Sequence, residues 1–134
     1  MKHASELGLN YEPKLPLNKH RIFIIGAGGI VKDAHLPAYV LAGFHVAGIF
    51  DVNKKVAHEV GTTFQIPVFE TLESMIDAYD ESVIFDIALP ASAFPDVLIK
   101  LPFASSVLLQ KPMGNSLEEA QVILAICRLS LIHI

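Results

Sequence analysis

The chain of 134 residues is long enough for one domain with a hydrophobic core. Its net charge of −4, without a cluster of Lys and Arg, gives no electrostatic support to nucleic-acid binding. Hydrophobic residues make up 52% of the chain, yet no uninterrupted apolar segment reaches the ~18 residues of a membrane-spanning helix. A parallel sheet covered by helices on both faces explains the hydrophobicity better than a membrane location, because its strands are buried on both sides.

The cysteine content and the N-terminal segment indicate a reducing compartment. Cys127 is the single cysteine, so an internal disulfide is excluded. Residues 1–20 are polar, contain Pro13 and Pro16, and lack the apolar core of a signal peptide. We therefore expect a cytoplasmic protein with an irregular N-terminal arm.

After this arm, segments with strand character alternate with segments of helical period. The strand candidates are residues 21–25, 45–51, 67–69, 83–89 and 105–109. The helix candidates are residues 30–42, 53–61, 72–78, 91–100 and 117–128. Strict alternation predicts an α/β fold: a Rossmann-type, doubly wound parallel sheet of about five strands.

Local signals mark the ends of several predicted helices. Asn53 and Thr71 are suited to cap the second and third helices, and Gly61 to lie just past the end of the second. Ser116 and Glu119 form the pattern of a capping box at the start of the last helix.

Residues 21–51 carry the pattern of a dinucleotide-binding βαβ unit. An apolar strand leads into the turn Gly26-Ala-Gly-Gly-Ile, then a helix, then a strand ending at Asp51. Gly26 would form the tight turn, and Gly28 would let a pyrophosphate approach the free N–H groups of the helix. Asp51 lies 25 positions after Gly26, close to the usual separation of roughly 20 for a ribose-binding carboxylate. The alternative is a purely structural strand-to-helix turn.

Two features of the helix after this turn depart from the usual pattern. Val31 occupies the third fingerprint position, where Gly or Ala normally permits close packing of the helix on the strand. It must either push the helix outward or find room in the core. Pro37 lies within the helical pattern, so we expect this helix to start late or to kink.

Five motifs together resemble the N-terminal half of the Gfo/Idh/MocA oxidoreductases, the relatives of glucose–fructose oxidoreductase and inositol 2-dehydrogenase. Within residues 21–128, they are Gly26-Ala-Gly-Gly-Ile, His35-Leu-Pro-Ala-Tyr, Gly48-Ile-Phe-Asp, Ala88-Leu-Pro and Gln110-Lys-Pro-Met-Gly. The most specific is Lys111-Pro112, where the family carries Glu-Lys-Pro. The resemblance implies that Lys111 lies beside the nicotinamide and the substrate hydroxyl, and that the Lys111–Pro112 bond is cis.

The resemblance also implies a cofactor, which we expect to be NAD rather than NADP. The implied cofactor-binding residues are Gly26, Gly28, Gly29, Ile30, Asp51, Val52, Leu89, Pro90, Gln110, Lys111 and Pro112, with Lys111 also the catalytic residue. Asp51 would repel a 2′-phosphate. Lys54 and Lys55 are the counter-evidence, since either could swing over such a phosphate.

Two positions differ from the family pattern. Gln110 replaces the glutamate, which removes a carboxylate that could steer Lys111. Phe94 and Pro95 follow the fourth strand where the family often has a His, so no His contact to the cofactor is assumed. Asp86 lies inside an apolar strand; it is either a strand-end polar group or a helper at the cleft, and we favour the former.

The histidines do not suggest a metal centre. His35 is expected to pack at a helix terminus under the cofactor loop rather than to catalyse. No metal-ligand spacing connects the others, which are His3, His20, His45, His58 and His133. We therefore predict no metal site.

The resemblance implies hydride transfer between NAD and a secondary alcohol or carbonyl of a sugar, cyclitol or related polyol. Lys111 would polarise or deprotonate that oxygen, with a His of a second domain as the main base. The alternative is a sensor or regulatory module that binds NAD without turnover, because the fold does not separate the two functions. For the full-length protein we expect a homo-oligomer.

The family's sixth strand and its C-terminal α+β domain, which carries the substrate pocket, have no counterpart in the sequence. Residues 129–134 resemble the translation of a transposon end used in sequencing-library preparation, which leaves 21–128 as the predicted NAD(P)-binding Rossmann domain. We therefore expect a fragment that is catalytically inert by itself. Its last strand, residues 105–109, would be an open apolar edge.

Overall fold

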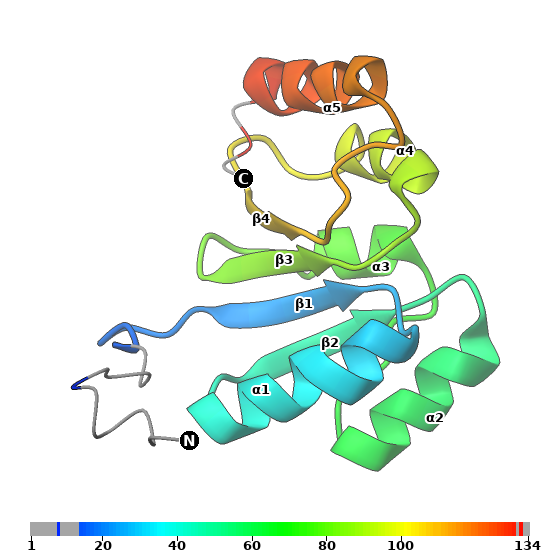
Figure 1. Cartoon of the computed structure of the whole chain (residues 1–134). Helices are drawn as coiled ribbons and strands as arrows, with labels where there is room; N and C mark the ends of the chain where they lie inside the picture. Colours follow the sequence, from blue (N-terminus) through cyan, green and yellow to red (C-terminus); the bar gives the residue numbers. More distant parts are fainter. Residues whose placement is uncertain (1–7, 9–13, 131, 133–134) are drawn as a thin grey trace, which may run out of the picture.

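The computed structural model describes Gly8, residues 14–130 and Ile132, and shows a parallel sheet between two layers of helices (Figure 1). The four strands are β1 (Arg21–Ile25), β2 (Val46–Phe50), β3 (Val83–Ile87) and β4 (Ser106–Leu109), in the spatial order β2-β1-β3-β4. Each pairing between neighbouring strands is parallel. The predicted Rossmann-type α/β fold is therefore confirmed.

The third predicted strand, residues 67–69, is reduced to a single bridge. Val68 pairs in parallel with Ile49 of β2. The Ile49 N–H donates to Pro67 O at 3.0 Å, and the Phe69 N–H donates to Ile49 O at 2.9 Å. Pro67 has no N–H with which to extend this ladder. The segment lies on the free side of β2, so the order of the five segments is that of a Rossmann sheet.

The helices that follow β1 and β2 cover one face of the sheet (Figure 1). They are the wide turn η2 (Val31–His35), α1 (Leu36–Ala42) and α2 (Lys54–Phe64). Ile22, Ile24 and Ile49 of the strands share a buried cluster with residues of these helices. The first helix begins with a wide turn before Pro37, in agreement with the irregularity that Pro37 predicted there.

The helices that follow the bridge segment, β3 and β4 cover the other face. They are α3 (Leu72–Asp77), the 3-10 turn η3 (Ala91–Ala93), α4 (Phe94–Leu98) and α5 (Leu117–Leu129). Phe23, Ile25 and Phe85 belong to the larger buried cluster on this side. Alternate residues of β1 thus enter opposite clusters, which explains why the strand is apolar throughout.

The end of α2 differs from the prediction. Asn53 caps its start, as expected, by accepting from the Val56 N–H at 3.4 Å. The helix continues past Gly61 to Phe64, and Gln65 ends it in the left-handed conformation with φ of 56°. Gly61 was predicted to follow the helix, but it instead provides space for packing. A Cβ at Gly61 would lie 2.4 Å from Val68 Cγ2.

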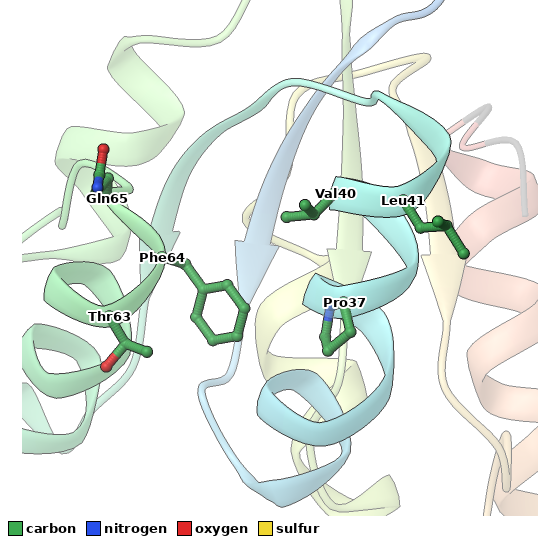
Figure 2. Close-up of a pocket in the computed structure, with 6 residues that line it drawn as sticks. All are labelled: Pro37, Val40, Leu41, Thr63, Phe64 and Gln65. Carbon is green, nitrogen blue, oxygen red and sulfur yellow. The ribbon is translucent and has the colours of Figure 1, made fainter.

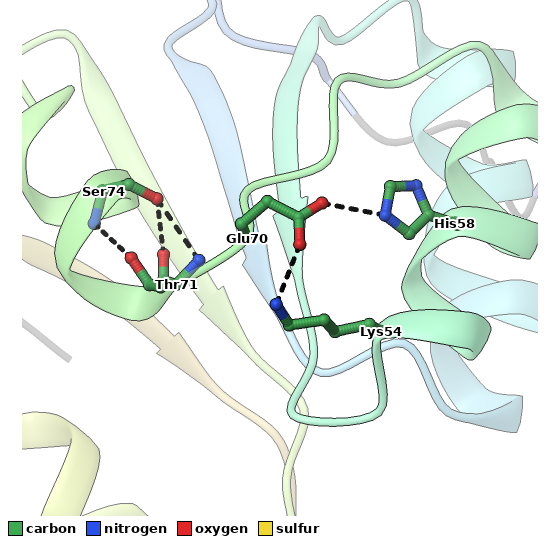
Figure 3. Close-up of polar contacts among 5 residues, drawn as sticks. All are labelled: Lys54, His58, Glu70, Thr71 and Ser74. Carbon is green, nitrogen blue, oxygen red and sulfur yellow. Dashed lines mark hydrogen bonds and ion pairs between the residues drawn. The ribbon is translucent and has the colours of Figure 1, made fainter.

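The capping box also occurs at a different helix from the one predicted. At α3, the Ser74 N–H donates to Thr71 Oγ1 at 3.0 Å and the Thr71 N–H donates to Ser74 Oγ at 3.4 Å (Figure 3). At α5, Ser116 Oγ accepts from the Glu119 N–H at 3.2 Å. Glu119 Oε2 accepts from the Asn115 N–H at 2.7 Å instead of returning to Ser116, so only half of that box forms.

The described residues after α5 pack against the domain. Ile132 is buried, and its N–H donates to Cys127 O at 2.8 Å. Most of the predicted arm and half of the predicted tail lie outside the described residues, namely residues 1–7, 9–13, 131 and 133–134. No helix within the described part of the chain is both long and apolar enough to cross a bilayer.

Candidate cofactor and active site

The carboxyl ends of the four parallel strands lie at one edge of the sheet, and every predicted site residue follows one of them (Figure 1). Residues 26–30 follow β1, residues 51–52 follow β2, residues 89–90 follow β3 and residues 110–112 follow β4. The fold therefore brings the predicted set to the edge at which open α/β sheets bind their ligands.

Gly26 makes the turn out of β1, and no other residue fits there. Its φ is +103°, and a Cβ would lie 2.3 Å from the backbone oxygen of Ala88. The Gly26 N–H donates to Phe50 O at 2.8 Å, which ties the turn to the end of β2. Leu89 also lies against this turn, because its Cδ2 would be 3.2 Å from the same Cβ. Pro90 follows it and begins η3.

The next residues of the turn leave space beside the backbone. A Cβ at Gly28 would have no neighbour within 4 Å, and one at Gly29 would meet only Asp33 Oδ2 at 3.8 Å. Packing within the described residues therefore does not require glycine at either position. Gly29 and Ile30 open the helical turn, where backbone N–H groups have no partner inside the helix. The turn thus presents free donors next to open space, as binding of a phosphate group requires.

Val31 finds room in the core. It is fully buried and lies in the cluster with Ile22 and Ile24. The helix is widened here, since the Leu36 N–H donates to Val31 O, five residues earlier. Pro37 has no N–H to continue a regular ladder, which accounts for an irregular turn immediately before it.

Asp51 connects the glycine turn to the start of α2. Its Oδ2 accepts from the Ala27 N–H at 2.7 Å, and its Oδ1 accepts from the Asn53 N–H at 2.7 Å. Each oxygen keeps a further lone pair for a ligand. Val52 is exposed beside it. The carboxylate is therefore oriented by the backbone before any ribose arrives.

The loop after β4 carries Lys111 at the same edge. The Lys111–Pro112 bond is cis, as the resemblance implied. The Gln110 N–H donates to Ile87 O at 3.0 Å, and Gln110 Oε1 accepts from the Lys111 N–H at 2.8 Å. The Lys111 side chain is exposed.

A polar network, formed by Tyr39, Asp86, His35 and Gln110, lies behind this loop. Asp86 Oδ2 accepts from the Tyr39 hydroxyl at 2.8 Å and lies 2.7 Å from His35 Nδ1. His35 Nε2 in turn lies 2.8 Å from Gln110 Nε2. Burial, together with the neighbouring Asp86 carboxylate, raises the pKa of Tyr39, so the hydroxyl remains a donor at neutral pH.

Sequence reasoning missed this network, although two signals were present. Asp86 was interpreted as a strand-end polar group in preference to a helper at the cleft, whereas its side chain is buried and contacts Tyr39 and His35. His35 and Tyr39 are four residues apart on one helical segment and therefore share a face. A carboxylate in an apolar strand, together with two polar rings on one helix face, could have suggested the contact.

Lys54, the cation nearest to Asp51 in sequence, is engaged by Glu70 (Figure 3). Lys54 Nζ lies 3.1 Å from Glu70 Oε2, and His58 Nε2 lies 2.9 Å from Glu70 Oε1. The hydrogen bond with Lys54, followed by that with His58, lowers the pKa of Glu70. Lys54 is thus directed toward Glu70 in the structure.

Two hollows of the surface differ in whether predicted site residues line them. A hollow of about 380 Å³ is lined by Asp51, Val52, Lys54 and Glu70 together with residues of α3 and α4. A larger one of about 650 Å³ lies between α1 and α2, where Phe64 points toward the helix that carries Pro37 and Val40 (Figure 2). No predicted site residue lines this larger hollow.

Residues 20–130 match the model of the Gfo/Idh/MocA family, described as an oxidoreductase family with an NAD-binding Rossmann fold. The chain belongs to this family.

Two named proteins are similar to this chain, one in sequence and one in structure. The glucose-6-phosphate 3-dehydrogenase of Bacillus subtilis (strain 168) is 34% identical over 103 residues, which cover 76% of this chain and 29% of that enzyme. The chain thus spans less than a third of that relative's length. The WlbA dehydrogenase from Bordetella pertussis, in complex with NADH and UDP-GlcNAcA, superposes with a TM-score of 0.72 at 22% identity, covering 85% and 35% of the two chains.

A second solved structure gives a similar fit. The UDP-N-acetylglucosamine 3-dehydrogenase GnnA from Acidithiobacillus ferrooxidans has a TM-score of 0.69 at 23% identity, covering 85% of this chain and 36% of that one. At these identities the structural likeness establishes the fold alone.

As a Gfo/Idh/MocA Rossmann domain, the chain has a site that fits a dinucleotide. A Cβ placed at Gly28 would have free space within 4 Å, and the Asp51 carboxylate lies at the same sheet edge, as the pyrophosphate and the ribose of a dinucleotide would require. Within the described residues, no three or more His, Cys, Asp and Glu side chains lie close enough to hold a metal ion. His3 and His133 lie outside those residues.

Proposed function

We propose that the whole protein transfers hydride between NAD and a secondary alcohol or carbonyl on a sugar, cyclitol or related polyol. The observation that carries the proposal is the joint position of three groups at one sheet edge: the open glycine turn, the Asp51 carboxylate and Lys111. Because the chain spans 29% of its B. subtilis relative, the activity is proposed for the complete gene product.

Binding of NAD is assigned to residues that follow β1, β2, β3 and β4. Gly28, Gly29 and Ile30 would receive the pyrophosphate through backbone N–H groups. Asp51, with the exposed Val52 beside it, would accept hydrogen bonds from the ribose hydroxyls. The remaining contacts are assigned to Gly26, Leu89, Pro90, Gln110, Lys111 and Pro112.

Lys111 is proposed as the catalytic residue. Bound NAD accepts or returns a hydride. The exposed ammonium group of Lys111 would polarise the substrate oxygen, or its neutral amine would take the proton of the hydroxyl. The polar contacts of Gln110 hold the Lys111 backbone by its N–H, so the side chain starts from a defined point.

Two contacts support a preference for NAD over NADP. The Ala27 N–H holds the Asp51 carboxylate beside the glycine turn, where it would repel a 2′-phosphate. Lys54, which could have received that phosphate, is directed toward Glu70 at 3.1 Å. The sequence left Lys54 as evidence for NADP, and its pairing with Glu70 weakens that evidence.

A sugar is proposed as the substrate because named relatives act on sugars. Glucose-6-phosphate 3-dehydrogenase and UDP-N-acetylglucosamine 3-dehydrogenase are named for oxidation at position 3 of a sugar. A secondary ring hydroxyl of a sugar, either phosphorylated or linked to a nucleotide, is therefore the first class to test.

The test is turnover by the complete gene product with NAD and a panel of sugars, sugar phosphates, nucleotide sugars and cyclitols, followed as NADH absorbance. We expect the free energy of unfolding of Lys111→Met to differ by less than about 1 kcal/mol from that of the unaltered protein, as is usual for exposed loop cations. Its kcat should fall by ~100-fold or more, the scale of a lost acid–base group.

Lys14→Met, in the exposed segment before β1, is the matched control and should leave kcat unchanged. An unchanged kcat in Lys111→Met would remove Lys111 from the chemistry. NAD binding without turnover of any substrate class would favour a sensor over an enzyme.

A further inference from the structure

Asp86 is a buried carboxylate that the chemistry proposed above does not use. It lies in the apolar strand β3 and is 0% exposed. Asp86 and Ser105 are the two buried polar residues of the described part of the chain. Its Oδ2 takes part in two hydrogen bonds, whereas its Oδ1 has no partner among the described residues. Burying a charge is unfavourable unless strong contacts offset it. A buried carboxylate in an apolar strand therefore indicates a role beyond packing.

The polar network joins Asp86 to the backbone of Lys111 through two side chains. His35 lies between Asp86 and Gln110, with ring nitrogens 2.7 Å from Asp86 Oδ2 and 2.8 Å from Gln110 Nε2. Gln110 then accepts from the Lys111 N–H at 2.8 Å. The three links bring together the turn before α1, the strand β3 and the loop after β4.

The chemistry of the groups permits one hydrogen-bond direction along the network. A backbone N–H only donates, so the Lys111 N–H requires Gln110 Oε1 and turns the Gln110 amide nitrogen toward His35. An amide NH2 only donates, so His35 Nε2 must be an acceptor without a hydrogen. A neutral His35 then carries its hydrogen on Nδ1, facing the Asp86 carboxylate, which accepts.

Resting on the proposed function of Lys111, we infer that Asp86 and His35 are positioning residues for this lysine. Asp86 selects the Nδ1–H tautomer of His35, His35 fixes the orientation of the Gln110 amide, and Gln110 holds the Lys111 backbone. The reaction centre thus depends on a carboxylate inside the sheet that touches neither cofactor nor substrate.

The same logic explains why position 110 is a glutamine in this chain. A glutamate there would present only acceptor oxygens to His35 Nε2, so both carboxylates could be satisfied only by a His35 that carries a hydrogen on each ring nitrogen. Gln110 is therefore the partner that lets a neutral His35 donate to Asp86, although none of the hydrogen bonds described joins Asp86 to Gln110. Misplacing a reacting group by about 1 Å can lower a rate by ~10²-fold, so a defect in this match should be measurable.

The sharpest experiment reverses the network by two substitutions in the complete gene product. Gln110→Glu alone places a carboxylate against each ring nitrogen of His35, and a neutral ring, which has a single N–H, cannot donate to both. Asp86→Asn alone retains a carbonyl oxygen for the His35 Nδ1–H and should be mild. The double variant provides an amide donor at position 86 and a carboxylate at position 110. His35 can then accept at Nδ1 and donate from Nε2, while the new carboxylate still accepts from the Lys111 N–H.

We expect kcat of Gln110→Glu to fall by about tenfold, and by more than the affinity for NAD, since a lost hydrogen bond of this kind corresponds to roughly one decade. The double variant should recover kcat to within about threefold of the unaltered protein. Ser105→Ala, which removes the other buried polar side chain and whose Oγ has no hydrogen-bond partner among the described residues, is the matched control and should leave kcat unchanged.

The tautomer of His35 is measured separately, in ligand-free protein labelled with 15N-histidine, by the nitrogen chemical shifts. We expect Nδ1–H in the unaltered protein and Nε2–H in the double variant. An Nε2–H tautomer in the unaltered protein, or a double variant no more active than Gln110→Glu, would overturn the inference. The NAD titration and the tautomer measurement do not depend on turnover. A protein that binds no NAD but shows the expected Nδ1–H tautomer would refute the proposed function and leave the hydrogen-bond network intact.

Discussion

At the scale of single residues, Glu70 pairs with two basic side chains, one of which, Lys54, lines the same hollow as Asp51. Its contacts with Lys54 and His58 lower its pKa, although the group is exposed. A lowered pKa means that these contacts stabilise the fold above the ordinary titration range of a glutamate. That stabilisation is lost only as the pH falls through the lowered value. At neutral pH, Lys54 therefore has an ionised partner other than a phosphate.

Glu70→Gln should release Lys54 and improve binding of NADP relative to NAD by about two- to fivefold, the scale of an exposed ion pair. The measurement is the ratio of the two dissociation constants, determined by titration. Glu73→Gln is the matched control, because Glu73 lines the same hollow but lies near Lys100, at 3.8 Å. An equal change of the ratio in both variants would show a general charge effect in place of a role for Lys54.

At the scale of elements, the turn between β1 and the first helix contains one glycine that the fold needs and one that only a ligand would need. The fold requires glycine at position 26, because its φ is +103° and a Cβ there would lie 2.3 Å from Ala88 O. Gly28 faces open space and is required only if something binds there. The two glycines of one motif thus have different structural reasons: the backbone conformation requires Gly26, and the proposed ligand would require Gly28.

Gly26→Ala should lower the free energy of unfolding by more than about 1 kcal/mol, since alanine is strained at this φ and collides with the Ala88 carbonyl. Gly28→Ala should change stability by less than about 0.5 kcal/mol. It should weaken NAD binding about tenfold or more, because a methyl group would block the approach of the pyrophosphate. Thermal unfolding and NAD titration of both variants test this. A stable Gly26→Ala or a Gly28→Ala with full NAD affinity would contradict it.

The sequence predicted the order and type of these elements better than their ends. Apolar runs and cap residues identified β1, β2, β3, β4 and the start of α2, because those signals are local. The continuation of α2 through Gly61 depends on Val68, which packs where the Cβ would be. The short pairing at residues 67–69 likewise depends on Pro67 meeting β2. Such endings are decided by tertiary contacts.

The candidate site shows the same division. The sequence could predict which residues follow the strands and share one edge, because parallel strands bring their carboxyl ends together. The contact between His35 and Asp86 spans 51 positions and was not found. Its recognition requires knowing which face of the first helix meets β3, and this depends on the wide turn at residues 31–35.

At the scale of the whole molecule, the larger core cluster connects the sheet to α5 through Cys127. The side chain is buried together with Ile123 and Ile132, and burial raises the pKa of its thiol. A raised pKa lowers the fraction of reactive thiolate at neutral pH. Cys127 is the single cysteine of the chain and therefore reports on the packing of α5 alone.

Cys127 should react with iodoacetamide at least ~100-fold more slowly in the native protein than in denaturant, because reaction requires opening of α5 from the sheet. The measurement is the rate of mass increase at neutral pH, with Cys127→Ser as the blank. Rapid labelling of the native protein would show that α5 is not packed as described.

The hydrogen bond from the Ala27 N–H to Asp51 has a consequence for how cofactor preference could evolve or be engineered. Ala27 is buried, so removing the Asp51 side chain to admit a 2′-phosphate also leaves an amide without its acceptor. An unsatisfied buried amide costs about 1–3 kcal/mol. A change of preference therefore passes through a destabilised intermediate unless the new residue keeps an acceptor oxygen. Asn or Ser at this position keeps an oxygen that can accept a hydrogen bond, whereas Ala or Gly does not.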